Sequence, residues 1–330
     1  MPGSASAAGG GPRPGEDRLA ALSIDLDGLA HYHRIHGLRA RPPGPDPVHG
    51  RAIARFRELC DRLGIRGTAF CIGRDLDDAE AAAAIAALAR DGHEIANHTL
   101  THDYALTRRD PEAIAAEVRG GAAAVARVTG TAPAGFRAPG YTLTAGLIGL
   151  LAADGYRYDS SAFPALPYHA AKAAVMAALA VARRPSAAVL DRPAVLLAPR
   201  SPYRPSREDP YRRGSLPILE LPVTTGLGGF PLIGTFVATW PAALLSVAAA
   251  TTRRLPLFNL ELHGVDLLDA SDASPELARR QRDLRVPAAR KIERIEAFVR
   301  ALGGRRWVTL ASAAEQLAPR MGARDLPPHP

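Results

Sequence analysis

The chain has 330 residues, of which 47% are hydrophobic, so it can bury a core the size of one large domain or two ordinary ones. Its formal net charge is +8, and among its basic residues only Lys172 and Lys291 are lysines. This excess of arginine has two readings, a general compositional preference or attraction to an anionic surface or substrate. The sequence contains no zinc finger, RNA-binding motif or basic run with interleaved aromatics, so nucleic acid is not an expected partner.

The two cysteines, Cys60 and Cys71, are too few to form a disulfide framework for a chain of this length. Residues 1–17 are rich in Gly, Ala, Pro and Ser, without the apolar run of a signal peptide or anchor, and they predict a flexible tail. No stretch reaches the roughly 18 apolar residues of a membrane span. By default, these features predict a cytoplasmic protein.

In the first half of the chain, predicted strands alternate with predicted helices. After the first strand, a polar loop contains His31, His33 and His36. The helix over 111–129 begins with Pro and ends before Gly130, as helices commonly do. The strands span 19–24, 68–72, 94–96, 134–137 and 156–159, and the helices span 51–63, 79–90, 111–129 and 144–154. This alternation predicts an α/β fold with a parallel sheet, and in a (β/α) barrel the polar residues after each strand face one common pocket.

The second half of the chain is less regular. An apolar helix over 169–182 is followed by an Arg- and Pro-rich loop. Further on, the patterns predict strands over 216–222, 257–262 and 307–310, and helices over 241–251, 286–302 and 312–317.

His98 and His102 form the most distinctive local pattern. Histidines at i and i+4 lie on one face of a helical turn, where both imidazoles can reach one metal ion. A capped polar helix start, with histidines that only make hydrogen bonds, is the alternative. A hydrolytic metal site also needs an anionic ligand, which Asp25 or Asp27 can provide after the first strand. Two carboxylates in one pocket can divide metal binding and proton transfer, although an Asx turn explains the same residues.

Two further positions suggest catalytic chemistry. Arg137 precedes Pro139-Gly140-Tyr141, a turn whose backbone N–H groups can face a developing oxyanion, while Arg137 can hold a carboxylate. A surface turn with a solvated arginine is the alternative. His263 ends a predicted strand, where it can act as a general acid or base, or serve a purely structural role.

Five motifs occur in the order found in one protein family. They are Asp-x-Asp-Gly at 25–28, His-Thr-x-x-His at 98–102, Arg-x-Pro-Gly-Tyr at 137–141, Tyr-Asp-Ser-Ser at 158–161 and Leu-x-Leu-His at 260–263. Together they resemble the NodB-type polysaccharide deacetylases, carbohydrate esterase family 4. The resemblance is close over 19–161 and loose over 216–317. It implies a distorted (β/α) barrel of about seven strands spanning 18–320, with a tail over 321–330.

The resemblance also implies roles for single residues. Asp27, His98 and His102 would bind Zn²⁺, or another divalent ion such as Co²⁺ or Ni²⁺. Asp25 would be the general base, oriented by Arg137, and His263 the general acid that protonates the leaving amine. The backbone of Gly140 or Tyr141 would stabilise the oxyanion, and Asp159 would tune His263 or line the pocket. The implied activity is removal of an N-acyl group, expected to be acetyl, from an amino sugar or glycan.

The sequence departs from the common family pattern in two places. The usual adjacent aspartates are replaced by Asp25-Leu26-Asp27, the spaced form of some branches. An insertion at about 164–215 separates the fourth motif from His263, and it would form a lid, a dimer contact or a membrane-facing element.

The substrate stays open at this stage. Residues 222–224 and 262–264 faintly resemble the branch that deformylates a lipid-linked aminoarabinose. Two apolar helices with basic ends would then contact the inner membrane face peripherally, although packing against the barrel explains them equally well. A non-sugar amide substrate and a non-catalytic sugar-binding module are the remaining alternatives.

Overall fold

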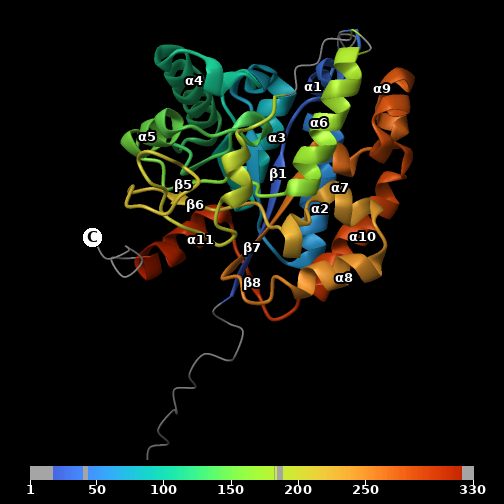
Figure 1. The fold of residues 1–330 in the computed structure, drawn as a ribbon. Helices are drawn as coiled ribbons and strands as arrows, with labels where there is room; N and C mark the ends of the chain where they lie inside the picture. Colours follow the sequence, from blue (N-terminus) through green and yellow to red (C-terminus); the bar gives the residue numbers. More distant parts are fainter. Residues whose placement is uncertain (1–17, 40–43, 182, 184–188, 322–330) are drawn as a thin grey trace, which may run out of the picture.

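A computed structural model describes residues 18–39, 44–181, 183 and 189–321, and the predicted tails 1–17 and 321–330 lie outside these residues except for Met321. Its strands form one parallel sheet in the order β6-β5-β4-β3-β2-β1-β7, with β8 paired to β1. Figure 1 shows this sheet at the centre of the molecule. The strands are β1 Leu19–Asp25, β2 Thr68–Cys71, β3 Glu94–Asn97, β4 Gly135–Phe136, β5 Tyr158–Asp159, β6 Leu219–Glu220, β7 Leu257–His263 and β8 Arg306–Trp307.

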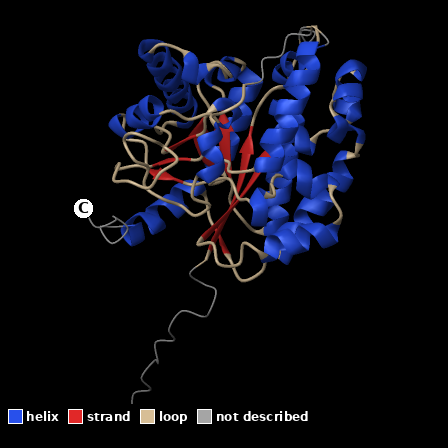
Figure 2. Cartoon of the chain, in the orientation of Figure 1, coloured by secondary structure: helices blue, strands red, loops and turns tan. Residues whose placement is uncertain are grey.

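Helices surround the sheet (Figure 2). They are α1 Leu29–Ile35, α2 Ile53–Leu63, α3 Ala79–Arg90, α4 Pro111–Thr129, α5 Ala145–Ala153, α6 Leu166–Val181, α7 Gly234–Thr239, α8 Ala242–Ala250, α9 Pro275–Arg280, α10 Ala288–Ala301 and α11 Leu310–Leu317. The helices α3 and α4 have the bounds that the sequence predicts, because Asp78 and Asp110 cap their first turns and Gly130 ends α4 in a left-handed conformation.

The sheet curves so that its two end strands approach each other. The backbone N–H of Thr224, just after β6, donates to the carbonyl of Asn259 in β7 at 3.1 Å. Ile233 also forms a parallel bridge with Glu261. The predicted distorted (β/α) barrel of about seven strands is therefore confirmed.

The strand β1 shows how the barrel separates its two apolar layers. Ala20, Leu22 and Ile24 belong to the core between the sheet and the outer helices. Leu19 and Ala21 belong to a second cluster with Phe70, Tyr158 and residues of α11, which fills the barrel interior. Alternate residues of a strand point to opposite faces, so Ser23 and Asp25 continue the interior row. The interior therefore becomes polar at the carboxyl ends of the strands.

Several elements differ from the predicted local structure. Residues 29–35, predicted as a polar loop, form α1, because Leu29 and Tyr32 bury their side chains in the core. The short helices α7 and α9 were not predicted, since neither is long enough to show helical periodicity. The strand β6 is shorter than the predicted strand over 216–222, and α6 begins at Leu166 instead of His169.

Candidate active site

Asp27, His98 and His102 meet at the carboxyl end of the barrel. The Oδ1 atom of Asp27 lies 3.3 Å from Nε2 of His98 and 3.2 Å from Nε2 of His102. All three side chains are buried, and one donor atom from each lies within 4.8 Å of the others. Two imidazoles and one carboxylate are a ligand set that suits Zn²⁺ with open positions for water and substrate.

The two histidines do not lie on a helical turn, contrary to the prediction from their spacing. They belong to an irregular loop after β3, in which Thr99 and His102 adopt positive φ angles of 67° and 57°. The helix α4 holds this loop, because Glu117 accepts hydrogen bonds from the backbone and hydroxyl of Thr101 at 2.9 and 2.7 Å. Asn97 adds a bond to the N–H of Thr99 at 3.0 Å. Positive φ angles at non-glycine residues are costly and persist only where surrounding contacts impose them.

The hydrogen bonds of this group match what a cation requires. Nδ1 of His98 lies 2.7 Å from the carbonyl oxygen of Arg137, to which it donates, so Nε2 is left as the lone-pair donor that a metal needs. Among the described residues, Oδ1 of Asp27 and Nε2 of His102 are buried without a hydrogen-bond partner. Because buried polar atoms are rarely left unsatisfied, this donor set fits a divalent ion.

The pKa shifts of Asp27, His98 and His102 are consistent with a bound divalent ion. Burial would raise the pKa of Asp27, but the imidazoles of His102 and His98 outweigh it and hold the pKa well below the ordinary value. Burial lowers the pKa of His102, which favours the neutral form that binds metals. For His98, burial also lowers the pKa, but the carboxylates of Asp25 and Asp27 outweigh it and raise the pKa. The negative potential that would hold a proton on His98 would also hold a cation.

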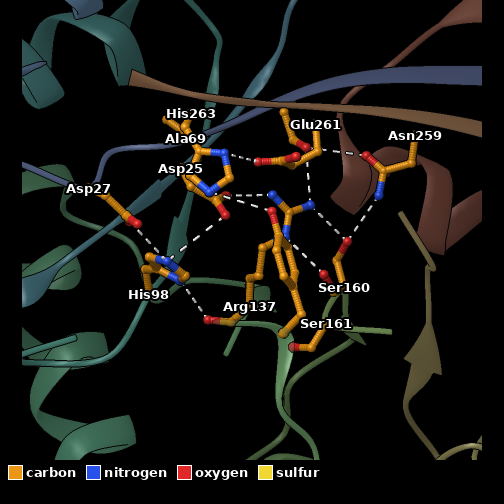
Figure 3. A network of polar contacts seen from close by, with 12 residues as sticks. Asp25, Asp27, Ala69, His98, Arg137, Ser160, Ser161, Asn259, Glu261 and His263 are labelled. Carbon is orange, nitrogen blue, oxygen red and sulfur yellow. Dashed lines mark hydrogen bonds and ion pairs between the residues drawn. The ribbon is translucent and has the colours of Figure 1, made fainter. Parts of the chain in front are cut away.

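Asp25 is held by the buried guanidinium of Arg137 (Figure 3). The side chain of Arg137 is completely buried and donates to Oδ1 of Asp25 at 2.5 Å. Its other donors bind the backbone carbonyl and hydroxyl of Ser160 at 2.8 and 2.9 Å and the hydroxyl of Ser23 at 3.1 Å. The second oxygen of Asp25 lies 4.0 Å from Nε2 of His98, so the carboxylate faces the Asp27-His98-His102 group with a fixed orientation.

His263 lies next to Asp25, because the two residues are register partners in β7 and β1. Its Nδ1 forms an ion pair with Oε1 of the buried Glu261 at 2.8 Å, and its Nε2 lies 3.5 Å from the hydroxyl of Tyr141. Burial would lower the pKa of His263, but the charges of Glu261, Asp25 and Asp27 raise it well above the ordinary value. These charges therefore favour the protonated imidazole, which is the form that a general acid requires.

Asp159 was predicted to tune His263 or to line the pocket, but no hydrogen bond or ion pair joins it to His263 and it is not among the residues that line the cavity. It accepts hydrogen bonds from the backbone and hydroxyl of Ser161 and interacts with the buried Glu220. The carboxylate beside His263 is Glu261, which the sequence analysis missed. Its signal was a lone acidic residue inside an otherwise mostly apolar predicted strand.

The predicted oxyanion turn has a different geometry from that expected. Gly140 and Tyr141 both adopt positive φ angles, of 65° and 63°. The backbone N–H of Tyr141 already donates to the carbonyl of Ala138 at 3.1 Å. The side chain of Tyr141 reaches His263, so its hydroxyl is the polar group of this turn that contacts a catalytic candidate directly.

Six of the residues described above line one cavity of about 340 Å³. Asp25, Asp27, His98, Gly140, Tyr141 and His263 all line it. The helix α6, from the inserted segment, covers part of the opening with Ala171, Lys172, Val175 and Met176. The sequence had left the role of this insertion open, and the structure brings its helix to the candidate site.

Residues 46–158 match the sequence model of the polysaccharide deacetylase family. This segment includes His98, His102 and Arg137, whereas Asp25, Asp27 and His263 lie outside it. No curated protein sequence matches the chain.

Similar solved structures include three with stated organisms. A candidate polysaccharide deacetylase from Mycobacterium smegmatis has 18% identity and a TM-score of 0.59, with 99% of each chain covered. A family 4 acetyl xylan esterase from Clostridium thermocellum, in complex with a cobalt ion, has 15% identity and a TM-score of 0.45, with 92% of each chain covered. A family 4 pseudoenzyme from Bacillus anthracis has 9% identity and a TM-score of 0.47, covering 91% of this chain and 66% of its own.

The first of these structures supports the shared fold, and the family model supports the shared sequence signature. Over residues 46–158 the chain is therefore similar in sequence to the polysaccharide deacetylase family, and over its whole length it shares the fold of the first of these structures.

Proposed function

We propose that the protein removes an N-acyl group, normally acetyl, from an amino sugar in a reaction that depends on a divalent metal. The main evidence for this proposal is that three groups of side chains lie together at one cavity. These are the Asp27-His98-His102 group, the Asp25–Arg137 pair and the His263–Glu261 pair. They supply a metal site, a candidate base and a candidate acid.

Asp27, His98 and His102 would hold the ion, for which Zn²⁺, Co²⁺ and Ni²⁺ are the candidates. When bound, such an ion supplies Lewis acidity, which polarises the amide carbonyl and makes water a stronger acid. The three ligands also leave room for substrate, because the cavity opens beside them.

Asp25 would accept the proton of the attacking water. Arg137 occupies its Oδ1, so Oδ2 is the oxygen that faces the Asp27-His98-His102 group and can take up the proton. His263, on the adjacent strand, would give its proton to the amide nitrogen as the C–N bond breaks. The water oxygen forms the new C–O bond, and the products are a carboxylic acid and a free amine.

A metal and product analysis tests the proposal. The purified protein would be loaded with Zn²⁺, freed of excess metal, and assayed for bound metal and for release of acetate and formate from acylated amino sugars and from small non-sugar amides. We expect about one ion per chain and acyl release from the sugars. Asp27→Ala and His98→Ala should lose both.

His49→Ala is the matched control, because His49 pairs with Asp75 at 3.2 Å and does not line the cavity. It should keep both the metal and the activity. Full metal content and turnover in His98→Ala would refute the ligand assignment. Hydrolysis of non-sugar amides alone would refute the sugar substrate, and a metal-loaded protein that binds sugars without releasing acid would identify a non-catalytic module.

A further inference from the structure

The helix α6 consists mostly of apolar residues, with His169 and Lys172 as exceptions, yet none of its side chains whose burial the structure describes is buried. Leu166, Val175 and Val181 are 55%, 51% and 87% exposed. A helix of this composition normally lies inside a protein core. In this chain it lies beside α1 and α7 at the rim of the catalytic cavity (Figure 1).

One face of α6 continues from the catalytic cavity into a second, larger one. Val175 lines both cavities, and so do His36, Thr235 and Gln281. The second cavity has a volume of about 1120 Å³. Its apolar wall contains Val175, Ala178 and Leu179 of α6 together with Trp240 and Val286, and we call this space the α6 groove. Because the α6 groove and the catalytic cavity share these lining residues, they lie side by side. A molecule held at the Asp27-His98-His102 group can therefore extend along α6.

Basic groups lie along this path. Lys172, one of two lysines in the chain, lines the catalytic cavity from α6. Its Nζ contacts the carbonyl of Gly140 at 3.4 Å and lies 5.8 Å from the ring centre of Tyr168. An ammonium group has three donors, so an acceptor in the cavity would complete its hydrogen bonding. Further along, the exposed Arg280 and Arg282 line the α6 groove, together with the buried Asp283.

The arrangement of these apolar and basic side chains fits one kind of ligand. A purely polar glycan would leave the walls formed by Val175, Leu179 and Trp240 without an apolar partner. A membrane surface would contact the exposed outer positions of α6, such as Val181, but would not explain apolar side chains inside a groove that joins the active site. A second copy of the chain could offer a carboxylate to Lys172 only by inserting a side chain into the catalytic cavity, which Lys172 lines.

We propose that the substrate is amphiphilic, with an acylated amino sugar at the metal group, an anionic linkage beside Lys172, and an apolar chain in the α6 groove. The sugar end of this inference rests on the proposed function. The apolar chain of the substrate is inferred from the α6 groove, and its anionic linkage is inferred from Lys172. Binding measurements can therefore test both parts without any turnover.

The binding test uses alkyl phosphates below their micelle-forming concentrations. Isothermal titration of the zinc-loaded protein would compare dodecyl phosphate with butyl phosphate. Each methylene removed from water should tighten binding by about fourfold, so a chain that follows the groove should bind at least a hundredfold more tightly than butyl phosphate. Equal dissociation constants for the two phosphates would overturn the proposal.

Two valines on the same helix provide a matched pair. Val175→Asn places an amide in the groove and should weaken dodecyl phosphate at least fivefold, with little effect on butyl phosphate. Val181→Asn makes the same change at an exposed position that lines neither cavity, and it should bind as the unmodified protein does. An equal loss of dodecyl phosphate affinity in both variants would indicate a general surface effect. It would contradict binding of the alkyl chain in the α6 groove.

Lys172 is tested by charge. Lys172→Met should weaken both phosphates at least tenfold, and Lys172→Arg should restore most of the affinity. Phosphate binding that is unchanged in Lys172→Met would remove this residue from the proposal and overturn the anionic linkage.

An activity measurement then separates this inference from the proposed function. N-acetylglucosamine 1-phosphate, its dodecyl ester and free N-acetylglucosamine would be compared by acetate release. The dodecyl ester should have a kcat/KM at least tenfold above that of the other two, and equal values for all three would contradict the amphiphilic substrate. If no compound releases acetate while the titrations behave as expected, the proposed reaction fails and the amphiphile site stands.

Discussion

Replacing Glu261 with Gln should move the alkaline limit of activity to lower pH. Gln keeps the size of the side chain and an oxygen that can accept from Nδ1 of His263, but it removes the negative charge 2.8 Å from that nitrogen. A full charge pair at this distance is worth about 6 kcal/mol at an effective dielectric constant of about 20. Asp25 and Asp27 also favour the imidazolium and remain in the variant.

The expected shift follows from these contributions. An opposite charge in contact typically moves a pKa by about 1 to 3 pH units, and we expect a shift of this size. The sign is downward, because burial already lowers the pKa of His263 and the variant loses the charge that most opposes burial. Protonated His263, and with it donation to the leaving amine, would then be lost at a lower pH than in the unmodified enzyme.

The assay is the dependence of kcat on pH for acetate release, across the acidic, neutral and alkaline range. Activity of Glu261→Gln should approach that of the unmodified enzyme in acid and fall early as the pH rises. Glu220→Gln is the matched control, because burial raises the pKa of Glu220 well above its ordinary value and this carboxyl lies beside Asp159, not His263. An unchanged or upward-shifted alkaline limit in Glu261→Gln would refute the role of His263 as the acid.

Further predictions concern the metal, the guanidinium and the loop after β3. Metal affinity should fall as the solution is acidified through the raised pKa of His98, because protons and metal compete for the same nitrogen, and titration with a metal indicator would measure this. Excess Zn²⁺ at about 100 times its dissociation constant should stabilise the fold by about 2.7 kcal/mol, and a His98→Ala variant should not respond. Arg137→Met should lower the free energy of unfolding in urea by about 3 to 5 kcal/mol, because Asp25 is left buried and unpaired; a loss below 1 kcal/mol would contradict this. Gly121→Ala should cost about 1 to 3 kcal/mol and weaken zinc binding, since its Cβ would lie 2.2 Å from Oδ1 of Asn97, whereas Gly149→Ala meets nothing within 4 Å and should stabilise α5 by up to about 1 kcal/mol.

The sequence was sufficient to predict which strand ends meet. Asp25 and Arg137 each follow or end a strand, and parallel strands bring such positions to one edge regardless of their separation in the chain. Strand assignment therefore predicts that both residues face one pocket, and the family resemblance adds that these two side chains, 112 residues apart, contact each other. Strand assignment also places Asp25 and Asp27 in the pocket with the histidines, and the resemblance selects Asp27 as the ligand.

The local conformation between strands was not predictable in this way. The spacing of His98 and His102 suggested a helical turn, but contacts with Asn97 and with Glu117 of α4 impose left-handed residues on the loop. The sequence also did not predict that Lys172 lines the cavity, for a similar reason. Its position depends on how α6 packs over the barrel, and no short-range pattern in an Ala-rich helix specifies that.

The charge balance of the cavity links the metal site to the choice of substrate. Three carboxylates lie in or beside the cavity, those of Asp25, Asp27 and Glu261, and so do two cationic groups, Arg137 and a protonated His263. With the carboxylates ionised, these five groups together have one net negative charge. Such a charge in a buried site favours a divalent cation, and binding one reverses the sign to a single positive charge. In the proposed reaction, that surplus would favour the negative charge that develops on the amide oxygen during hydrolysis. Lys172 adds a second positive charge in the same cavity at neutral pH, where its pKa, lowered to about 8 by burial, still keeps it mostly protonated. The reacting amide needs only one of these charges, so the second is available to a separate anionic group on the substrate.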